Sequence, residues 1–493
     1  MLTYDFSSVN GPLYKALYDF IREDILRGRL TANEKMPSKR MLAENLGVSS
    51  ITIENAYDRL ISEGYMYSVP KKGYYVADLG NFPAESAFFP GDLGEGFKYS
   101  GEKKAGIIIP EHKGKEKFNF SSNKAAPDTF PFATWAKIMR EIMSSKKHEL
   151  LETSPCGGVW EIREAISSHL ASFRGMHVDP DQIIVGAGTE YLYGLLIQLL
   201  GREKVYCVEN PGYLKTGKIY INNGVKTVFA DLDDCGLNVD SLMKTGADIV
   251  HISPTHHFPT GITMPAKRRM ELLGWANERE ERFILEDDYD SEFRLNGKPV
   301  PPLMSMDSCG KVVYMNTFSK SLSSTIRISY MVLPEKLANE YYQRLSFYAC
   351  TVSNLDQYTL AEFIKRGYFE KHINRMRLYY SRKRKQVLEV ISGVFDESEC
   401  RIIENDSGLH FLMELNTDIS ERSIKEMLSA KGIRIQAVTD FAAGRLPVAG
   451  CGELNITESR QKMPDHRFIL NYSKIDTEGL EEALAEIKYI INK

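Results

Sequence analysis

The sequence lacks the signals of a secreted, membrane-spanning or disulfide-bonded protein. Its first ten residues, MLTYDFSSVN, contain no basic start followed by an apolar run, so we expect no signal peptide. No uninterrupted apolar stretch is long enough to cross a bilayer, so we expect no membrane partner. The seven cysteines are scattered, odd in number and never in a C-x-x-C spacing, which argues against a disulfide framework and a zinc site. These absences predict a cytoplasmic protein with reduced thiols.

An excess of charge of one sign is also absent. The net charge is -4 over 493 residues, so any nucleic-acid-binding surface must be local. The hydrophobic share of 43% and the charged share of 26% are ordinary for a globular protein. The length predicts more than one domain, each with a core of its own.

Residues 1–78 carry three helical patterns followed by a β-hairpin. Apolar residues at helical spacing indicate helices within residues 11–30, 36–47 and 48–65, of which the third begins at Ser49 or Ser50. The segment YMYSVPKKGYYVAD reads as two alternating strands around a turn. This order predicts a winged helix-turn-helix, although periodicity alone also permits another small helical domain. The third helix would bury Ile53, Ala56, Tyr57 and Leu60.

Basic side chains gather at two places in this predicted domain, although its acidic and basic residues are equal in number. One group lies at the start of the second helix and the other at the tip of the hairpin, where a winged helix-turn-helix meets phosphates. Hydroxyl groups near the start of the third helix are placed to reach base edges or phosphates. We therefore predict that double-stranded DNA is contacted by Lys39, Arg40, Ser49, Ser50, Thr52, Lys71 and Lys72.

The rest of the chain predicts an α/β domain after a linker. Residues 79–117 mix glycine, proline and charge without periodicity, as linkers do. From residue 118 onward, short apolar β-rich runs alternate with longer helical ones, which indicates a mainly parallel sheet covered on both faces. The seven predicted strands are QIIVGAG, KVYCVEN, TVFADL, DIVHISP, RFILED, KVVYMNT and RISYMVLP. Ligands of such sheets bind outside the carboxyl ends of the strands.

Polar residues follow four of these predicted strands. The first strand ends in the turn Gly186–Thr189, whose backbone N–H groups can hold an anion, and the second ends in a turn that presents Tyr213. The glycine-containing turn is also common in sheets that bind no ligand, and Tyr213 could instead be an aromatic residue that packs against its neighbours. The third end is crowded with carboxylates, which also permits a solvated loop or a metal site, and the fourth carries a lysine and an arginine. These last two ends contribute Glu286, Asp287, Asp288, Asp290, Lys320 and Arg327.

A single ligand, pyridoxal 5′-phosphate (PLP), would use all four ends. Its aldehyde needs a lysine amine that has lost its proton, which desolvation favours. Its protonated pyridine nitrogen needs a carboxylate, and a phenol can hydrogen-bond the ring oxygen. Its phosphate needs N–H donors, hydroxyl groups and an arginine.

Longer motifs resemble two known families. The segment ILRGRLTANEKMPSKRMLAENLGVSSITIENAYDRLISEGY resembles the DNA-binding domain of GntR-family bacterial regulators. The motifs SPTHHFPTGITMP, EDDYDSEFR and NTFSKSLSSTIRISY are similar to those of fold-type I aminotransferases. That resemblance implies such a domain over residues 118–493, with a smaller α+β subdomain from about residue 375. Both parts together resemble the MocR-type regulators.

The resemblance implies a role for each residue of the cofactor site. Lys320 would carry PLP as an internal aldimine, and Asp287 would pair with the pyridine nitrogen. Tyr289 would hydrogen-bond the phenolic oxygen, and Tyr213 would stack on the ring. The phosphate would be held by Gly188, Thr189, Thr317, Ser319 and Arg327.

Three departures from the family patterns bear on specificity. In the DNA-binding motif, Ser50 and Glu54 replace frequent arginines, which leaves the operator sequence open. In the aminotransferase motifs, Phe258 replaces an asparagine that contacts the ring oxygen, so this contact is missing or supplied by His256 or His257.

The third departure concerns the effector. Ile469 stands where aminotransferases bind the substrate carboxylate with an arginine. Arg467, two residues earlier and thus on the same strand face, is the residue that we expect to bind the effector instead.

Three functions remain open at this stage. The chain is a transcription regulator that senses an amino compound or PLP, an active aminotransferase between an amino acid and a 2-oxo acid, or a DNA-bound scaffold. The DNA-binding motif and Ile469 favour the regulator, and the presence of Lys320 disfavours the scaffold. We expect a homodimer in which a small amine or amino-acid effector displaces Lys320, alters closure of the small subdomain and changes the spacing of two DNA-binding heads.

Overall fold

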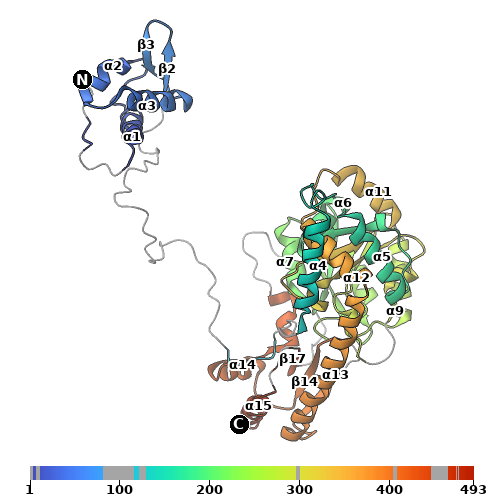
Figure 1. Cartoon of the computed structure of the whole chain (residues 1–493). Coiled ribbons are helices and arrows are strands. Elements are labelled where there is room, and N and C mark those ends of the chain that lie inside the picture. Colours follow the sequence, from blue (N-terminus) through green and yellow to red (C-terminus); the bar gives the residue numbers. More distant parts are fainter. Residues whose placement is uncertain are drawn as a thin grey trace. The chain divides into compact units, whose positions relative to one another are not determined.

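The computed structural model describes residues 4–6, 11–80, 116–121, 129–295, 300–403, 408–445, 465–473, 475 and 477–493. The chain divides into two compact units, Met1–Glu111 and His112–Lys493 (Figure 1). Most of the segment predicted as a linker, residues 81–115 of 79–117, lies outside the described residues. Within the described ranges, no helix combines the length and the apolar character needed to span a bilayer.

The first unit has the order of elements that the sequence predicts. Three helices pack on a three-stranded sheet of order β1-β3-β2. Ser38 caps α2 by accepting a hydrogen bond from Met41 N, and the left-handed Gly47 ends that helix. The four residues predicted as the buried stripe of α3 are all buried, whereas Leu13, the first residue of α1, is exposed. The elements are α1 Leu13–Leu26, β1 Lys35–Met36, α2 Lys39–Leu46, α3 Ser50–Ser62, β2 Met66–Val69 and β3 Gly73–Val76.

An eight-stranded sheet of order β5-β12-β11-β10-β9-β6-β7-β8 organises the second unit. All seven apolar runs predicted as strands are present in it, and the short β8 is an addition. Its strands are parallel except for β12 and β8, so the expectation of a mainly parallel sheet is confirmed. The strands are β5 Ile183–Gly186, β6 Val205–Asn210, β7 Lys226–Asp233, β8 Gly236–Leu237, β9 Ile249–Ile252, β10 Phe283–Asp287, β11 Val312–Thr317 and β12 Ser329–Val332.

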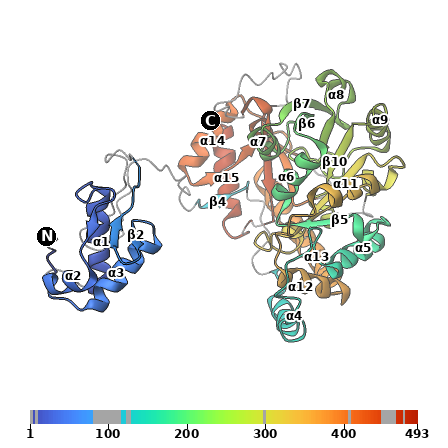
Figure 2. The same cartoon turned by 90° about the horizontal axis from the view of Figure 1, so that it is seen from above.

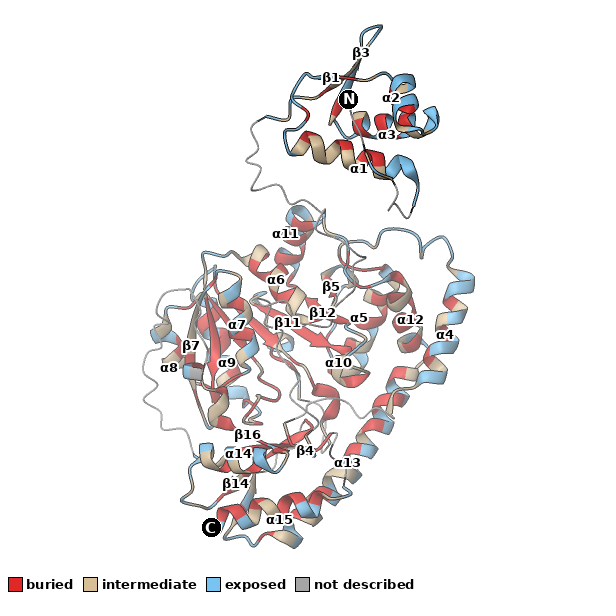
Figure 3. Cartoon of the chain, turned by 90° about the vertical axis from the view of Figure 1, so that its left-hand side faces the viewer, coloured by how far each residue is buried: buried red, intermediate tan, exposed pale blue. Residues whose placement is uncertain are grey.

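Helices cover both faces of this sheet, and the strands between them are buried (Figure 3). Alternate residues of one strand enter different cores: Ile184 packs with α6 and α11, whereas Ile183 and Val185 pack with α5 and α12. A strand that is apolar on both faces therefore reads as a continuous apolar run. The helices are α4 Phe132–Ser145, α5 Trp160–Arg174, α6 Thr189–Leu200, α7 Leu214–Asn222, α8 Val239–Thr245, α9 Ala266–Asn277, α10 Phe318–Ser321, α11 Glu335–Leu345 and α12 Asn354–Lys365.

The remaining elements build a small subdomain around a four-stranded antiparallel sheet of order β13-β14-β17-β16. The long helix α13 runs from the large sheet into this subdomain, where α15 packs on it (Figure 1). The strand β4 pairs with β15, so residues far apart in sequence share the subdomain, and Figure 2 shows β4 beside α14 and α15. The elements are β4 Phe118–Asn119, α13 Tyr368–Val394, β13 Cys400–Ile403, β14 His410–Leu415, α14 Glu421–Ala430, β15 Ile433–Arg434, β16 Gln436–Ala437, β17 Arg467–Asn471 and α15 Leu480–Ile491.

Candidate cofactor site and nucleic-acid surface

The direction of the strands brings the four predicted polar ends to one edge of the large sheet. The strands β5, β6, β10 and β11 run in the same direction, so their carboxyl ends share an edge. Because β12 is antiparallel to both β5 and β11, its first residue, Ser329, lies opposite Gly186 and Thr317. This reversal places Arg327, just before β12, at the same edge as Lys320, just after β11.

Asp287 ends β10 and is held from below by other buried side chains. The Tyr193 hydroxyl donates to Asp287 Oδ2 at 2.8 Å, and His251 Nε2 lies 3.6 Å from the same oxygen. The Tyr220 hydroxyl in turn lies 2.7 Å from His251 Nδ1. The second carboxylate oxygen, Asp287 Oδ1, is buried without a hydrogen-bond partner among the described residues. A buried carboxylate oxygen without a partner is costly, and a ligand N–H would satisfy it.

Lys320 lies in the one-turn helix α10, directly after β11. Burial lowers the pKa of Lys320 to about 8, and the carboxylates of Asp290 and Asp287 act in the opposite direction. A larger fraction of this amine is therefore neutral near pH 7 than of an ordinary lysine. The neutral amine is the form that attacks an aldehyde.

An anion cradle forms where β5 meets α6. Gly188 has φ +96° and is the N-cap of α6, so backbone N–H groups of the first turn point out of the helix. A side chain at position 188 would clash with the guanidinium of Arg327. Arg327 itself has a left-handed backbone, with φ +54°, which is uncommon outside glycine and concentrates at functional sites. Its guanidinium forms an ion pair with Glu190, which also pairs with Lys215.

Hydroxyl groups line the adjacent end of β11. Thr317 Oγ1 lies 2.9 Å from Ser319 Oγ and accepts a hydrogen bond from Ser329 Oγ at 2.8 Å. The backbone N–H of Ser319 also donates to Thr317 Oγ1, at 3.1 Å. The structure thus brings the predicted Thr317 and Ser319 together and adds Ser329. Thr189 is the first residue of α6 and follows Gly188 directly, so it lies at the same edge of the sheet.

An aromatic and histidine cluster lies on the other side of Lys320. The Tyr289 hydroxyl is 3.2 Å from His256 Nδ1, which also lies 2.8 Å from Asp290 Oδ2. Of the two histidines considered in place of the missing asparagine, His256 is thus the one beside Tyr289. His257 instead contacts Thr260 Oγ1 at 2.7 Å.

Tyr213 stands at the mouth of this cluster. It is the N-cap residue of α7, and 54% of its surface is exposed. Its ring packs edge to face against Phe258, with centroids 6.1 Å apart. The exposure of Tyr213 leaves part of its ring accessible to a ligand, as the stacking role implied by the resemblance requires.

The other carboxylates of the crowded strand end have partners of their own. Asp288 Oδ2 lies 2.6 Å from Arg174 Nη2 and accepts a hydrogen bond from the Tyr314 hydroxyl at 2.7 Å. Glu286 accepts from the backbone N–H groups of Leu303 and Met304. Burial raises the pKa of Glu286 to about 7. Among the residues with a described placement, no three His, Cys, Asp or Glu side chains are arranged to hold a metal ion.

Arg467, the expected effector ligand, begins β17 and is engaged by Glu414, with Nε 2.6 Å from Oε2. Strand β17 reaches the Lys320 site at its other end, where Asn471 lies opposite His410. Residues four apart on a strand are about 13 Å apart. The structure therefore does not bring Arg467 to the other predicted site residues, and its role stays a prediction.

Sequence reasoning missed the support beneath Asp287. Tyr193 and His251 lie within otherwise apolar runs, YLYGLLIQLL and DIVHIS, which read as core. A polar residue inside a strand that is buried on both faces is the signal that points to His251, because such a group needs a partner. Ser329 carries the same signal at the start of β12.

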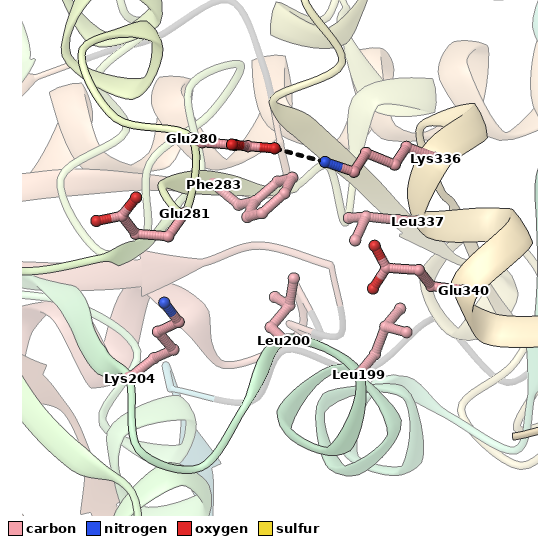
Figure 4. Close-up of a pocket in the computed structure, with 9 residues that line it drawn as sticks. All are labelled: Leu199, Leu200, Lys204, Glu280, Glu281, Phe283, Lys336, Leu337 and Glu340. Carbon is pink, nitrogen blue, oxygen red and sulfur yellow. Dashed lines mark hydrogen bonds and ion pairs between the residues drawn. The ribbon is translucent and has the colours of Figure 1, made fainter. Parts of the chain in front are cut away.

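A surface hollow lies at the opposite edge of the sheet, where β6 and β10 begin (Figure 4). It is lined by Leu199, Leu200, Phe283 and Leu337 together with charged side chains, and a Glu280–Lys336 ion pair of 2.7 Å crosses its rim. Since ligands of parallel sheets bind at the carboxyl ends of strands, this hollow is separate from the candidate site.

In the first unit, the predicted DNA contacts fall into exposed and paired residues. The wing residues Lys71 and Lys72 are exposed in the turn between β2 and β3. Arg40 is also exposed on α2, where its Nε lies 3.2 Å from Glu44 Oε1. Lys39 is instead engaged, with its ammonium 2.8 Å from Glu54 Oε1 and 3.4 Å from Asp58 Oδ1. These acidic partners lie on α3, so Lys39 contributes less positive charge to the surface than the sequence suggests.

The start of α3 presents hydroxyl groups and one apolar side chain. Ser49 is the N-cap residue of α3, and its hydroxyl accepts from Thr52 N at 3.2 Å. Ser50, the first residue of the helix, is exposed. Ile51, which follows Ser50 on this helix, is 68% exposed. An exposed isoleucine on a helix that would enter the major groove is suited to contact a thymine methyl group.

Comparisons with known proteins assign a family to each of the two units. The model of bacterial regulatory proteins of the gntR family matches residues 13–76, and that of aminotransferase class I and II matches residues 115–463. The uncharacterized HTH-type transcriptional regulator YdeL of Bacillus subtilis (strain 168) is 36% identical, over 92% of this chain and 96% of that protein. The probable rhizopine catabolism regulatory protein MocR of Rhizobium meliloti is 28% identical, over 97% of this chain and 93% of that protein.

A likeness to solved structures concerns the second unit. The multiple substrate aminotransferase of Thermococcus profundus matches with a TM-score of 0.64, over 77% of this chain and 92% of that chain, at 24% identity. At this level of identity the match shows a shared fold, which agrees with the mainly parallel sheet and the smaller C-terminal subdomain.

Proposed function

Since the chain belongs to the MocR-type transcriptional regulators, in which a GntR helix-turn-helix domain is joined to an aminotransferase class I and II domain, we propose that it regulates transcription through PLP bound at Lys320. The effector is a small amino compound that reaches the same site. As a regulator acting on DNA, the protein works in the cytoplasm.

The unpaired carboxylate oxygen of Asp287 is the observation that carries the cofactor proposal. The N–H of a protonated pyridine ring would satisfy Asp287 Oδ1, while Tyr193 and His251 hold the other oxygen in place. The pairing of Asp287 with the ring would keep its nitrogen protonated. The residues present therefore fit the pyridine nitrogen of PLP, whose protonation sets the electronic properties of the ring.

The remaining residues would hold the other parts of the cofactor. Lys320 provides the amine, and Tyr213 provides an exposed aromatic face. When bound, PLP supplies an aldehyde carbon at which a primary amine can take the place of Lys320. The phosphate would be held by Gly188, Thr189, Thr317, Ser319 and Arg327, and the ring oxygen by Tyr289.

Contacts between the two subdomains would carry the signal away from the site. Gly212 N donates to Phe441 O at 3.1 Å, and Ala443 N donates to Asn210 Oδ1 at 3.0 Å. Both hydrogen bonds join the turn that presents Tyr213 to the small subdomain. A ligand that displaces the ring or Lys320 would bias these contacts and hence subdomain closure. In a homodimer, this movement would change the spacing of the two DNA-binding heads.

The test uses the full chain incubated with PLP and then dialysed. We expect a visible absorbance band that is lost in Lys320→Ala and kept in Lys336→Ala, a lysine at the opposite edge of the sheet. Borohydride reduction followed by peptide mass analysis should place the cofactor on Lys320. A band that survives in Lys320→Ala contradicts the cofactor assignment. Binding to DNA from the protein's own promoter region, measured by fluorescence anisotropy at low salt, tests the regulator assignment.

A further inference from the structure

The two sides of the Lys320 site differ in charge. The cradle side carries the guanidinium of Arg327, the ammonium of Lys215 and the N-terminus of α6. On the other side lie His256, Phe258 and His410, followed by an apolar cluster. Phe258 packs against the rings of His410 and Phe441, with centroids 5.5 and 4.9 Å apart. The cradle side suits a phosphate, so the aromatic side is left for the effector.

Two histidines of the aromatic side, His410 and His257, carry no positive charge near neutral pH. Burial lowers the pKa of His410 to about 3, with smaller effects from His256 and Lys320 in the same direction. Burial likewise lowers the pKa of His257 to about 3. The groups that act electrostatically on Lys320 here include the carboxyl groups of Asp290 and Asp287, both of which raise its pKa.

The far wall of the aromatic side is apolar. Ile469 is only 2% exposed and packs in one cluster with Leu412, Val438 and Phe441, against Phe258. Arg467, on the same face of β17, is held by Glu414 at the end of the strand that lies away from Asn471 and His410. The described residues of this wall therefore offer a ligand apolar contact and no cation.

We propose that the effector is a primary amine without a carboxylate, whose apolar tail contacts the partly exposed ring of Phe258, which packs on the buried Phe441 and Ile469. This inference rests on the proposed function and specifies the ligand class of that site. An α-amino acid would place its carboxylate beside Asp290 and against an apolar wall, where an unpaired buried charge is costly. An amine of the same shape avoids this cost and keeps the gain from burying its tail.

The experiment compares matched pairs of ligands on the PLP-loaded full chain. Each pair has the same tail with and without the carboxylate: phenethylamine against phenylalanine, and isoamylamine against leucine. The dissociation constant is taken from the change in cofactor absorbance. We expect each amine to bind at least about tenfold more tightly than its amino acid. Equal binding, or tighter binding of the amino acids, overturns the proposal.

Two variants locate the source of the preference. Both ligands of a pair must displace Lys320, so the ratio of their dissociation constants cancels effects on the lysine itself. Asp290→Asn removes a negative charge, and we expect the ratio to fall several-fold. Ile469→Arg supplies a cation, and we expect it to invert the ratio if the buried arginine is tolerated. If amino acids bind tightly and Arg467→Ala weakens them, Arg467 is the carboxylate ligand and the proposal is wrong.

Failure of this inference can be told apart from failure of the proposed function. If the chain shows no cofactor absorbance that depends on Lys320, the cofactor assignment itself is wrong. If that absorbance is present but the amines are not preferred, only the ligand class is wrong. In the unsubstituted protein, borohydride reduction with peptide mass analysis answers the first question and the matched ligand pairs answer the second, so neither answer depends on whether a variant folds.

Discussion

The two units hold their candidate ligand contacts in opposite ways. In the helix-turn-helix unit, Lys71, Lys72, Ser50 and Ile51 are exposed and belong to short, separate segments of the surface. In the aminotransferase-like unit, Asp287 depends on Tyr193 and His251, and His251 contacts Tyr220. A surface contact acts through its own charge or shape, whereas a buried network acts as a unit. The difference predicts small, separable effects of substitution in the first unit and large, coupled effects in the second.

The largest effect should come from the buried ion pair below the site. Arg174 and Asp288 have side chains only 2% and 0% exposed, with Nη2 2.6 Å from Oδ2. Arg174→Met leaves the Asp288 carboxylate without its buried partner, and we expect a loss of about 3–5 kcal/mol in the free energy of unfolding. Chemical denaturation of the second unit measures it. Arg422→Ala, which removes an exposed pair with Glu426, should leave the midpoint unchanged.

A change in pH should have the next largest effect, through Lys320. With the pKa of Lys320 at about 8, its neutral form is lost as the pH falls, and about one molecule in ten has the neutral amine at pH 7. The rate of PLP attachment should therefore fall about tenfold per pH unit below 8 and level off above it. Stopped-flow absorbance measures this rate.

Asp290→Asn sharpens the pH prediction. The Asp290 carboxylate raises the pKa of Lys320 against the effect of burial, so its removal should move the midpoint of the rate profile to lower pH. A midpoint near the ordinary lysine value, about 10.4, would mean that Lys320 is not desolvated in the way that its burial implies.

Most of the fold and part of the site follow from the sequence, for reasons that differ between the two. The seven strands of the large sheet were predicted because each is a continuous apolar run, and the buried stripe of α3 because it repeats at helical spacing. Lys320 and Arg327 could be assigned to one edge once their strands were known. That they share this edge depends on the antiparallel direction of β12, which no local pattern encodes.

The rest of the site depends on contacts across the sheet, which sequence spacing does not reveal. Lys39 was expected at the DNA surface, but its pairing with Glu54 and Asp58 requires the packing of α2 on α3. Arg467 shares a strand face with Ile469, but the register of β17 with β14 places Arg467 opposite Glu414, at the end of the strand that lies away from the Lys320 site. In each case the sequence identifies a basic side chain, but it does not reveal the acidic side chain that pairs with it.

The anion cradle combines features of the two units. Its side chains are partly exposed, as in the first unit, but they are linked to one another by ion pairs, as in the buried network of the second. Glu190 pairs with both Arg327 and Lys215, so it competes with a phosphate for both cations. Glu190→Gln should tighten PLP binding about two- to fivefold, a modest change because these side chains are partly exposed. Equilibrium dialysis measures the dissociation constant.

The matched control for the cradle is Glu280→Gln. It breaks a similar exposed pair, with Lys336, at the opposite edge of the sheet (Figure 4). It should leave PLP binding unchanged. Weaker PLP binding in Glu190→Gln would instead mean that Glu190 orients Arg327 for the phosphate.

The smallest effects belong to the helix-turn-helix unit, and they should separate cleanly. Lys72→Ala removes one exposed charge, so it should weaken all DNA sequences alike and reduce the salt dependence of binding by about one phosphate contact. Ile51→Ala removes an apolar contact, so it should weaken the operator about two- to fivefold, leaving non-specific DNA and the salt slope unchanged. Fluorescence anisotropy at several salt concentrations measures both. Because the two residues lie on different segments, the double variant should show the sum of the two free-energy changes. A coupled response would mean that the surface of the first unit acts as a network, as the buried site of the second unit does.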